Sequence, residues 1–207
     1  VSFITVVRDE LRTIIIIFLL YLKYRCLSDS KKLYIKLYNY LLPLYTNGLD
    51  AVIVQDIGVL LFIKEKFPGM HIHASTQMTI FGDLTVEYLK KLGVSRIVTP
   101  RELSLNEISD IHQKTNLEIE SFVHGALCYC YSGQCFLSSF IGGRSGNRGQ
   151  CAQPCRMEYD VILNGKVLNK KNEKYVLSPK DICTLKSAGS NRKWCVFTES
   201  RRQNEET

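Results

Sequence analysis

Residues 71–98 read HIHASTQMTIFGDLTVEYLKKLGVSRIV and carry the pattern that decides the fold. Residues 71–75 are typical of a short buried strand, and residues 95–98 are typical of another. Between them, residues 83–92 have helical spacing of apolar side chains; Asp83 is a suitable N-cap, and the glycine after the segment is a suitable stop. A strand, a helix and a strand in this order predict a βαβ unit with parallel strands.

The same alternation continues on both sides of this unit. The further predicted helices are residues 32–42, 57–67 and 104–114, and the further predicted strands are residues 51–55 and 117–123. The last helix begins with Ser104 and Glu107 in the spacing of a capping box. The repeat predicts right-handed βα units and an α/β fold with a parallel sheet. An open doubly wound sheet and a TIM-barrel-like (β/α) domain both fit. A full barrel needs about 250 residues, so in a chain of 207 residues we expect an incomplete one.

Polar residues follow each predicted strand, where parallel α/β folds place their chemistry. These strand ends are residues 55–56 (QD), 75–77 (STQ), 99–102 (TPRE) and 124–125 (HG). We therefore expect a functional site along this edge of the sheet.

The two ends of the chain lack the βα pattern. Residues 1–30 form an atypical N-terminal segment, and residues 190–207 are a polar stretch expected to be a disordered or aberrant tail. Residues 157–176 alternate apolar and polar side chains around Asn164-Gly165, which predicts a β-hairpin insertion. Residues 177–183 are expected to form a turn that caps a helix. The chain begins with Val1, so we expect it to be a piece of a longer protein.

Composition limits the possible partners. The formal net charge is +7, which favours RNA or a small anionic substrate, although a basic surface also serves solubility. The longest apolar run, residues 14–22, is far shorter than the roughly 20 residues of a membrane helix, and no secretion signal is recognisable. We expect a cytoplasmic protein with reduced thiols, no membrane partner and no disulfide-linked partner.

Residues 120–156 form a Cys-rich loop. The loop holds Cys128, Cys130, Cys135, Cys151 and Cys155 among glycines and arginines. Thiolates in a flexible cationic loop suit a soft metal or an iron–sulfur cluster. The spacing matches neither a zinc ribbon nor a ferredoxin, so it predicts a metal without identifying it. Several unligated buried cysteines are the alternative.

Several separated motifs resemble the collagenase-like peptidases of unassigned catalytic type, peptidase family 32. The matching segments are residues 120–128 (ESFVHGALC) with 132–135 (SGQC), 73–77 (HASTQ), 101–104 (RELS), 148–156 (RGQCAQPCR) and 178–183 (SPKDIC). They stand in the order typical of the family and cover about residues 33–189.

The resemblance implies a TIM-barrel-like domain over residues 31–189 and two functional groups. One group is collagenase-like proteases. The other comprises oxygen-independent hydroxylases of tRNA, rRNA or the ubiquinone ring, which are linked to prephenate and carry a [4Fe–4S] cluster. The implied cluster ligands are Cys128, Cys135, Cys151 and Cys183, with Cys155 in reserve. The leading expectation is RNA hydroxylation with prephenate; a peptidase and an inactive truncated domain are the alternatives.

Other side chains complete the expected site. His124 and Glu120, four residues apart on one predicted strand face, and Gln77 are the candidate catalytic groups. Arginine forks bind carboxylates and phosphates, so cationic residues at the strand ends and in the loop are candidate substrate-binding groups. The substrate-binding candidates are Arg101, Arg148, Arg156 and Lys180.

Overall fold

A computed structural model describes residues 6–9, 12–16, 30–122, 124–125, 127–170, 173–178, 182–183 and 195–197. Its main sheet has the strand order β1-β2-β3-β4-β5-β6-β11. The strands are β1 (Val6–Asp9), β2 (Arg12–Ile16), β3 (Ala51–Val54), β4 (His71–Ala74), β5 (Val94–Val98), β6 (Glu118–Ser121) and β11 (Cys195–Phe197). The helices beside it are α1 (Ser30–Thr46), α2 (Ile57–Lys66), α3 (Asp83–Lys91) and α4 (Leu105–Thr115).

The order of the strands distinguishes the two folds that the sequence allowed. From β2 to β6 each strand lies parallel to the next in the chain. Among the described strands of this main sheet, only β1 pairs antiparallel, with β2. A doubly wound sheet reverses its direction of growth at a switch point. Here each new strand is added on the same side of the one before it. Right-handed crossovers therefore place all the helices on one face of the sheet, as in a (β/α) barrel. The described strands stay open, with β1 and β11 as the two edges. The prediction of an α/β fold is confirmed.

The helical face of the sheet contains the main core. Alternate strand residues point toward the helices because side chains on a strand change face at every step. The cluster joins strand residues such as Val52, Ile72 and Ile119 to helix residues such as Leu60 and Ile63. Burial of this apolar surface, at about 25 cal/mol per Å², stabilises the sheet and helices together.

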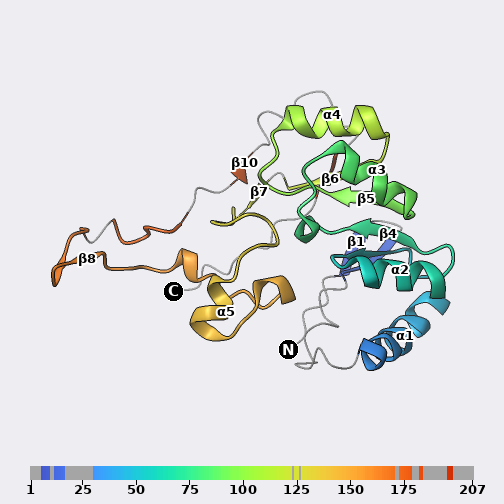
Figure 1. The fold of residues 1–207 in the computed structure, drawn as a ribbon, viewed down its shortest axis with the longest axis horizontal. Helices are drawn as coiled ribbons and strands as arrows, with labels where there is room; N and C mark the ends of the chain where they lie inside the picture. Colours follow the sequence, from blue (N-terminus) through green and yellow to red (C-terminus); the bar gives the residue numbers. More distant parts are fainter. Residues whose placement is uncertain are drawn as a thin grey trace.

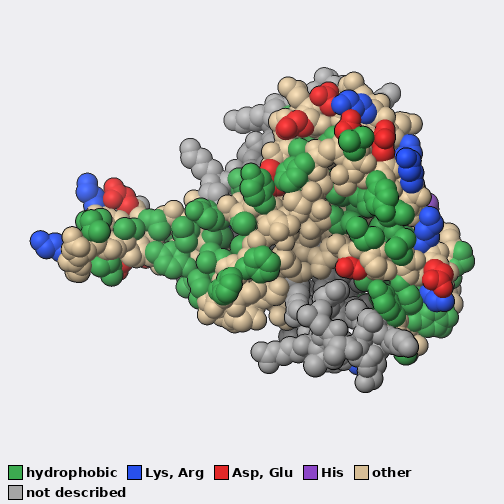
Figure 2. Space-filling view, viewed as in Figure 1, with side chains coloured by type: hydrophobic (Ala, Val, Ile, Leu, Met, Phe, Trp, Pro, Cys, Tyr) green, Lys and Arg blue, Asp and Glu red, His purple; other side chains and the backbone are tan. Residues whose placement is uncertain are grey.

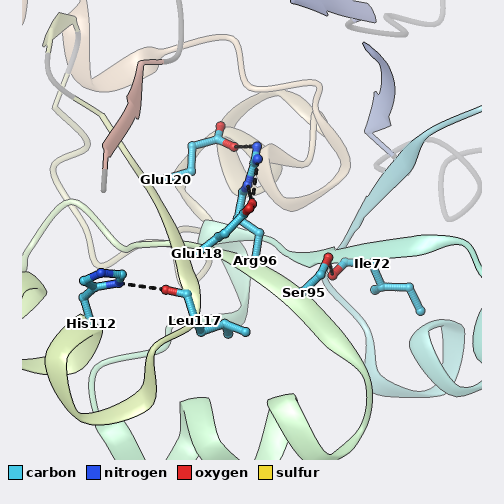
Figure 3. A network of polar contacts seen from close by, with 7 residues as sticks. All are labelled: Ile72, Ser95, Arg96, His112, Leu117, Glu118 and Glu120. Carbon is cyan, nitrogen blue, oxygen red and sulfur yellow. Dashed lines mark hydrogen bonds and ion pairs between the residues drawn. The ribbon is translucent and has the colours of Figure 1, made fainter. Parts of the chain in front are cut away.

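The opposite face combines apolar and charged residues. Figure 3 shows Arg96 of β5 lying between Glu118 and Glu120 of β6. Arg96 Nε and Nη2 donate to Glu118 Oε2 at 2.9 and 2.8 Å, and Arg96 Nη1 lies 3.6 Å from Glu120 Oε2. Glu120 is 5% exposed. Burial raises the pKa of Glu120, and the neighbouring Arg96 partly opposes this rise.

Several local predictions need correction. The N-cap of α3 is Gly82, not Asp83; Asp83 is the first helical residue, and its carboxylate pairs with Lys114 at 3.0 Å. Within residues 1–30, which showed no βα unit in the sequence, β2 pairs in parallel with β3 and α1 connects the two. Part of the predicted tail, β11, pairs in parallel with β6.

The chain after β6 leaves the main sheet. Strand β7 (His124–Gly125) pairs with β10 (Ile182–Cys183), so the end of the predicted turn at residues 177–183 is a strand. Short helices follow: α5 (Leu137–Gly142), η3 (Gly146–Arg148) and η4 (Pro154–Arg156). The predicted hairpin is confirmed as β8 (Ile162–Leu163) and β9 (Lys166–Val167), on an arm that extends away from the body (Figure 1). No helix in the described part of the chain is long and apolar enough to span a membrane.

Candidate metal centre at the carboxyl edge of the sheet

The carboxyl ends of β3, β4 and β5 contact the Cys-rich loop, as their polar residues predicted. After β3, Gln55 Nε2 donates to the carbonyl oxygen of Asn147 at 3.0 Å. After β4, Gln77 Nε2 lies 3.5 Å from the carbonyl oxygen of Gly146. These contacts fix the η3 turn to two neighbouring strand ends.

The turn between Cys128 and Cys135 is held by polar contacts centred on buried Ser132. Glu102 Oε1 accepts hydrogen bonds from Ser132 N at 2.9 Å and Ser132 Oγ at 3.3 Å. Thr79 Oγ1 donates to the Ser132 carbonyl oxygen at 2.7 Å. These contacts place the turn against the segments that follow β4 and β5.

Glycine is required at the closest approach of this turn. Gly133 has φ +78°, and a Cβ built there would lie 2.4 Å from the carbonyl oxygen of Gln77. A side chain would therefore face both a disfavoured backbone conformation and a backbone clash. The first cysteine-bearing turn lies directly on η2 (Thr76–Met78) because residue 133 has no side chain.

Arg101 connects the end of β5 to the first cysteine. Arg101 Nη1 donates to Cys128 Sγ at 2.7 Å, and the guanidinium carbon lies 4.5 Å from the centroid of the Phe122 ring. Hydrogen bonds to a ligating sulfur tune the metal that it holds, so Arg101 is placed to act on a metal bound at Cys128. Arg101 was predicted to bind substrate; in this structure its side chain contacts Cys128 directly.

Cys151 lies close to the backbone of the first turn. A Cβ built on Gly146 would lie 3.9 Å from both the Cys151 sulfur and the Cys135 carbonyl oxygen. The backbone N–H of Gln153 donates to Cys151 Sγ at 3.3 Å. Ser138 Oγ accepts from Ala152 N at 2.9 Å, which joins this segment to α5.

Cys155 lies within electrostatic range of three other thiols. Burial is the largest cause that raises the pKa of Cys155; Cys151, Cys128 and Cys135 raise it further, and Arg156 lowers it. The thiols of residues 128, 135, 151 and 155 thus lie in one region of the Cys-rich loop, within range of electrostatic interaction. Their donor chemistry fits an iron–sulfur cluster. In the described residues, however, no three potential ligands lie close enough to form a ready-made metal site.

The short second sheet joins the backbone of Cys183 to the start of the Cys-rich loop. Cys183 is the register partner of His124 in the β10–β7 pair, although the two residues are far apart in the chain. The side chains of both lie outside the described part of the structure, so their predicted roles stay predictions. Lys180 and the side chain of Arg148 also lie outside it.

The remaining predicted side chains occupy different positions. Glu120 and His124 do not share a strand: β6 ends at Ser121, and His124 belongs to β7. Glu120 lies instead on the buried sheet face beside Arg96. Gln77 lies at the edge, where its buried Oε1 has no hydrogen-bond partner within the described residues. Arg156 Nη2 donates to the Leu127 carbonyl oxygen at 3.1 Å.

Gln55 and Glu102, at two of the predicted polar strand ends, both contact the Cys-rich loop. Thr79 also contacts this loop and was not singled out from the sequence.

Comparisons with known proteins show what the chain is similar to. A model described as Peptidase family U32 matches residues 26–190. The chain is 46% identical over 139 residues to the 23S rRNA 5-hydroxycytidine C2501 synthase of Escherichia coli, covering 67% of this chain and 20% of that protein. It is 45% identical over 120 residues to tRNA hydroxylation protein P of Escherichia coli, covering 58% and 26%. It is 33% identical over 150 residues to a collagenase of Porphyromonas gingivalis, covering 66% and 35%. The chain therefore spans between a fifth and about a third of the length of these relatives.

Proposed function

This chain belongs to peptidase family U32, and from that membership we propose that it forms the cysteine-bearing part of an iron–sulfur protein that hydroxylates an RNA base without oxygen gas. The observation that carries the proposal is the placement of the cysteine-bearing turns at the carboxyl edge of the sheet, where Arg101 contacts Cys128 and the η3 turn contacts Gln55 and Gln77. Relatives named for the hydroxylation of rRNA and tRNA support RNA as the substrate.

We assign the cluster ligands to Cys128, Cys135, Cys151 and Cys183, with Cys155 as the alternative fourth ligand. A bound [4Fe–4S] cluster would supply electron transfer at the edge of the sheet. Arg101 would donate a hydrogen bond to the ligating sulfur of Cys128, from which its Nη1 lies 2.7 Å. The N–H of Gln153 would do the same for Cys151, since hydrogen bonds to cluster sulfurs tune the cluster's potential.

A small anionic co-substrate suits the cations of this edge. Prephenate, the oxygen source implied by the family resemblance, carries two carboxylates. Arginine forks bind carboxylates through two parallel hydrogen bonds. Arg101 and Arg156 are the described candidates, and Arg148 and Lys180 are candidates from the sequence. We place this reaction in the cytoplasm, where the thiols stay reduced.

Anaerobic purification followed by iron and acid-labile sulfide analysis tests the proposal. We expect iron and sulfide in equal amounts, with a broad visible absorbance that dithionite bleaches. Changing Cys151 to Ser is expected to remove most of the iron, and changing Cys130 to Ser, the matched control, to remove little. Stoichiometric zinc, or no metal after anaerobic preparation and reconstitution, would overturn the proposal. Comparison of Cys155→Ser with Cys183→Ser identifies the fourth ligand.

A peptidase is the second candidate, because one relative is named a collagenase. This function predicts cleavage of gelatin that survives the Cys→Ser changes. Retention of full gelatin cleavage by a metal-free Cys151→Ser variant would favour it.

A further inference from the structure

Two exposed aromatic rings meet at the Cys-rich loop: Tyr131 belongs to the loop, and Phe81 lies between η2 and α3. Tyr131 is 64% exposed and Phe81 is 42% exposed. Their rings meet edge to face, with centroids 6.0 Å apart and an interplanar angle of 87°. An edge-on contact leaves ring faces that the pair itself does not cover.

The segments that carry these rings are joined by hydrogen bonds. Residue 132, next to Tyr131, is buried and accepts from Thr79 Oγ1 through its carbonyl oxygen at 2.7 Å. Gln134 Nε2 donates to the same Thr79 hydroxyl at 3.3 Å. Tyr131 therefore needs little further ordering to bind a flat ligand, and preorganised aromatic side chains favour binding for this reason.

The aromatic pair is continuous with the candidate metal centre. The backbone N–H of Arg101 donates to Ser132 Oγ at 3.4 Å, while its side chain donates to Cys128 Sγ. Tyr131 is the chain neighbour of Ser132, which contacts Arg101 within the turn between Cys128 and Cys135. A ligand stacked on Tyr131 would therefore lie close to this turn.

We propose that Phe81 and Tyr131 form a stacking platform for an unpaired base of single-stranded RNA, which extends the proposed function by naming how the substrate is held. Unpaired RNA bases stack on aromatic side chains, and the phosphates that accompany them require positive charge nearby. The net charge of +7 and the guanidinium of Arg101, which contacts Cys128 in the same turn as Tyr131, supply this charge. A second copy of the chain or a peptide could also cover the two rings, but neither carries a phosphate at every unit and so neither requires cations beside them.

Fluorescence anisotropy with a labelled, pyrimidine-rich single-stranded RNA tests the platform in the full chain, prepared anaerobically. The wild type is expected to bind the single strand more tightly than the matching duplex. Tyr131→Ala and Phe81→Ala are each expected to weaken binding about 5- to 100-fold, because stacking on one aromatic side chain contributes on this scale. Tyr131→Phe is expected to retain the affinity. Tyr175→Ala, which removes a similarly exposed tyrosine from the arm, is the matched control and is expected to change nothing.

Two further measurements separate stacking from loss of charge or of fold. Tyr131→Ala is expected to leave the slope of log affinity against log salt unchanged, since that slope reports phosphate contacts. Iron content and the circular dichroism spectrum of the variant are expected to match the wild type.

The contrary outcomes are distinct. Equal RNA binding by wild type and Tyr131→Ala, or preference for the duplex, overturns the platform and leaves the proposed hydroxylation intact. A dimer that Tyr131→Ala dissociates, with RNA binding unchanged, assigns the rings to a second copy and also overturns it. Absence of iron and sulfide from the wild type, by contrast, removes the proposed function, and the RNA titration then decides the platform independently.

Discussion

Two halves of the molecule are stabilised by different forces. The first half is the sheet with its helices, residues 30–122, and the second is the Cys-rich half that follows, residues 127–178. Between Leu37 and Ile119, buried Leu, Ile, Val and Phe side chains form one cluster. Across the described residues of 127–178, by contrast, only Ser132, Ser138 and Pro154 are buried, and apolar side chains line the arm in full view of solvent (Figure 2). Burial of apolar surface stabilises the first half, whereas hydrogen bonds to the strand ends hold the second half in position.

This difference explains why the candidate chemistry lies in the second half. A side chain in a packed core has few alternative positions, because interiors are close-packed. A loop held by a few polar contacts can place thiols, a guanidinium and exposed rings beside one another without filling the space between them. The sheet supplies the rigid edge against which that loop is fixed.

The largest expected effect breaks the core of the first half. Leu60 and Leu61 are neighbours on α2, but Leu60 is fully buried and Leu61 is 46% exposed. Leu60→Ala is expected to lower the free energy of unfolding by about 2–5 kcal/mol, from lost burial and the cavity left behind. Leu61→Ala is expected to cost less than about 1 kcal/mol. Urea denaturation measures both, and equal losses would contradict burial as the dominant force there.

A second prediction tests the contact between the halves. Gly133 and Gly143 both have positive φ, but only Gly133 would bring a Cβ against backbone atoms, those of Gln77. Gly143→Ala is expected to cost about 1 kcal/mol for its conformation. Gly133→Ala is expected to cost roughly 1–3 kcal/mol more, and to expose the turn between Cys128 and Cys135.

Hydrogen exchange of residues 128–135, compared between these two alanine variants, is the decisive readout. Faster exchange in Gly133→Ala alone supports the close approach. Similar exchange in both variants would mean that the turn is not held against η2.

A third prediction measures one polar contact inside the first half. Ser104 and Glu107 form a reciprocal capping box at the start of α4: Ser104 N donates to Glu107 Oε2 at 2.7 Å, and Glu107 N to Ser104 Oγ at 3.3 Å. Ser104→Ala is expected to cost about 1 kcal/mol of unfolding free energy. Ser104→Asp, which can still cap, is the control. A loss as large as that of Leu60→Ala would show that polar contacts rival burial in this half.

The smallest expected effect concerns the buried Glu120. Because burial raises the pKa of Glu120 in the folded state, the folded protein binds the proton more tightly than the unfolded chain does. Stability is therefore expected to fall as the pH rises from the ordinary glutamate value through the raised one. Glu120→Gln removes this dependence. Urea denaturation across a pH series compares the two proteins.

The sign of this difference decides the outcome. Wild type and Glu120→Gln are expected to agree at low pH, and the wild type is expected to lose stability relative to the variant as the pH rises. A relative gain by the wild type would mean that attraction to Arg96 outweighs burial.

Periodic segments were predictable because their signals are local. The βαβ unit of residues 71–98, the capping box at Ser104 and the hairpin turn at Asn164-Gly165 were all predicted and found. Errors arose where one residue could serve two purposes. Asp83 suits an N-cap, but as the first residue of α3 it can also pair with Lys114. His124 was predicted to continue the strand of Glu120, but its segment pairs with β10, which is distant in the chain.

The sequence by itself determined the alternation of strands and helices, the polar strand ends and the family to which the chain is similar, because periodicity, caps and motifs depend on neighbouring residues. Tertiary structure alone decided the single direction of the sheet, the pairing of Cys183 with His124, the burial of Glu120 beside Arg96 and the approach of Tyr131 to Phe81. Each of these joins residues separated along the chain. Such contacts depend on how whole elements pack, and no local pattern in the sequence encodes that packing.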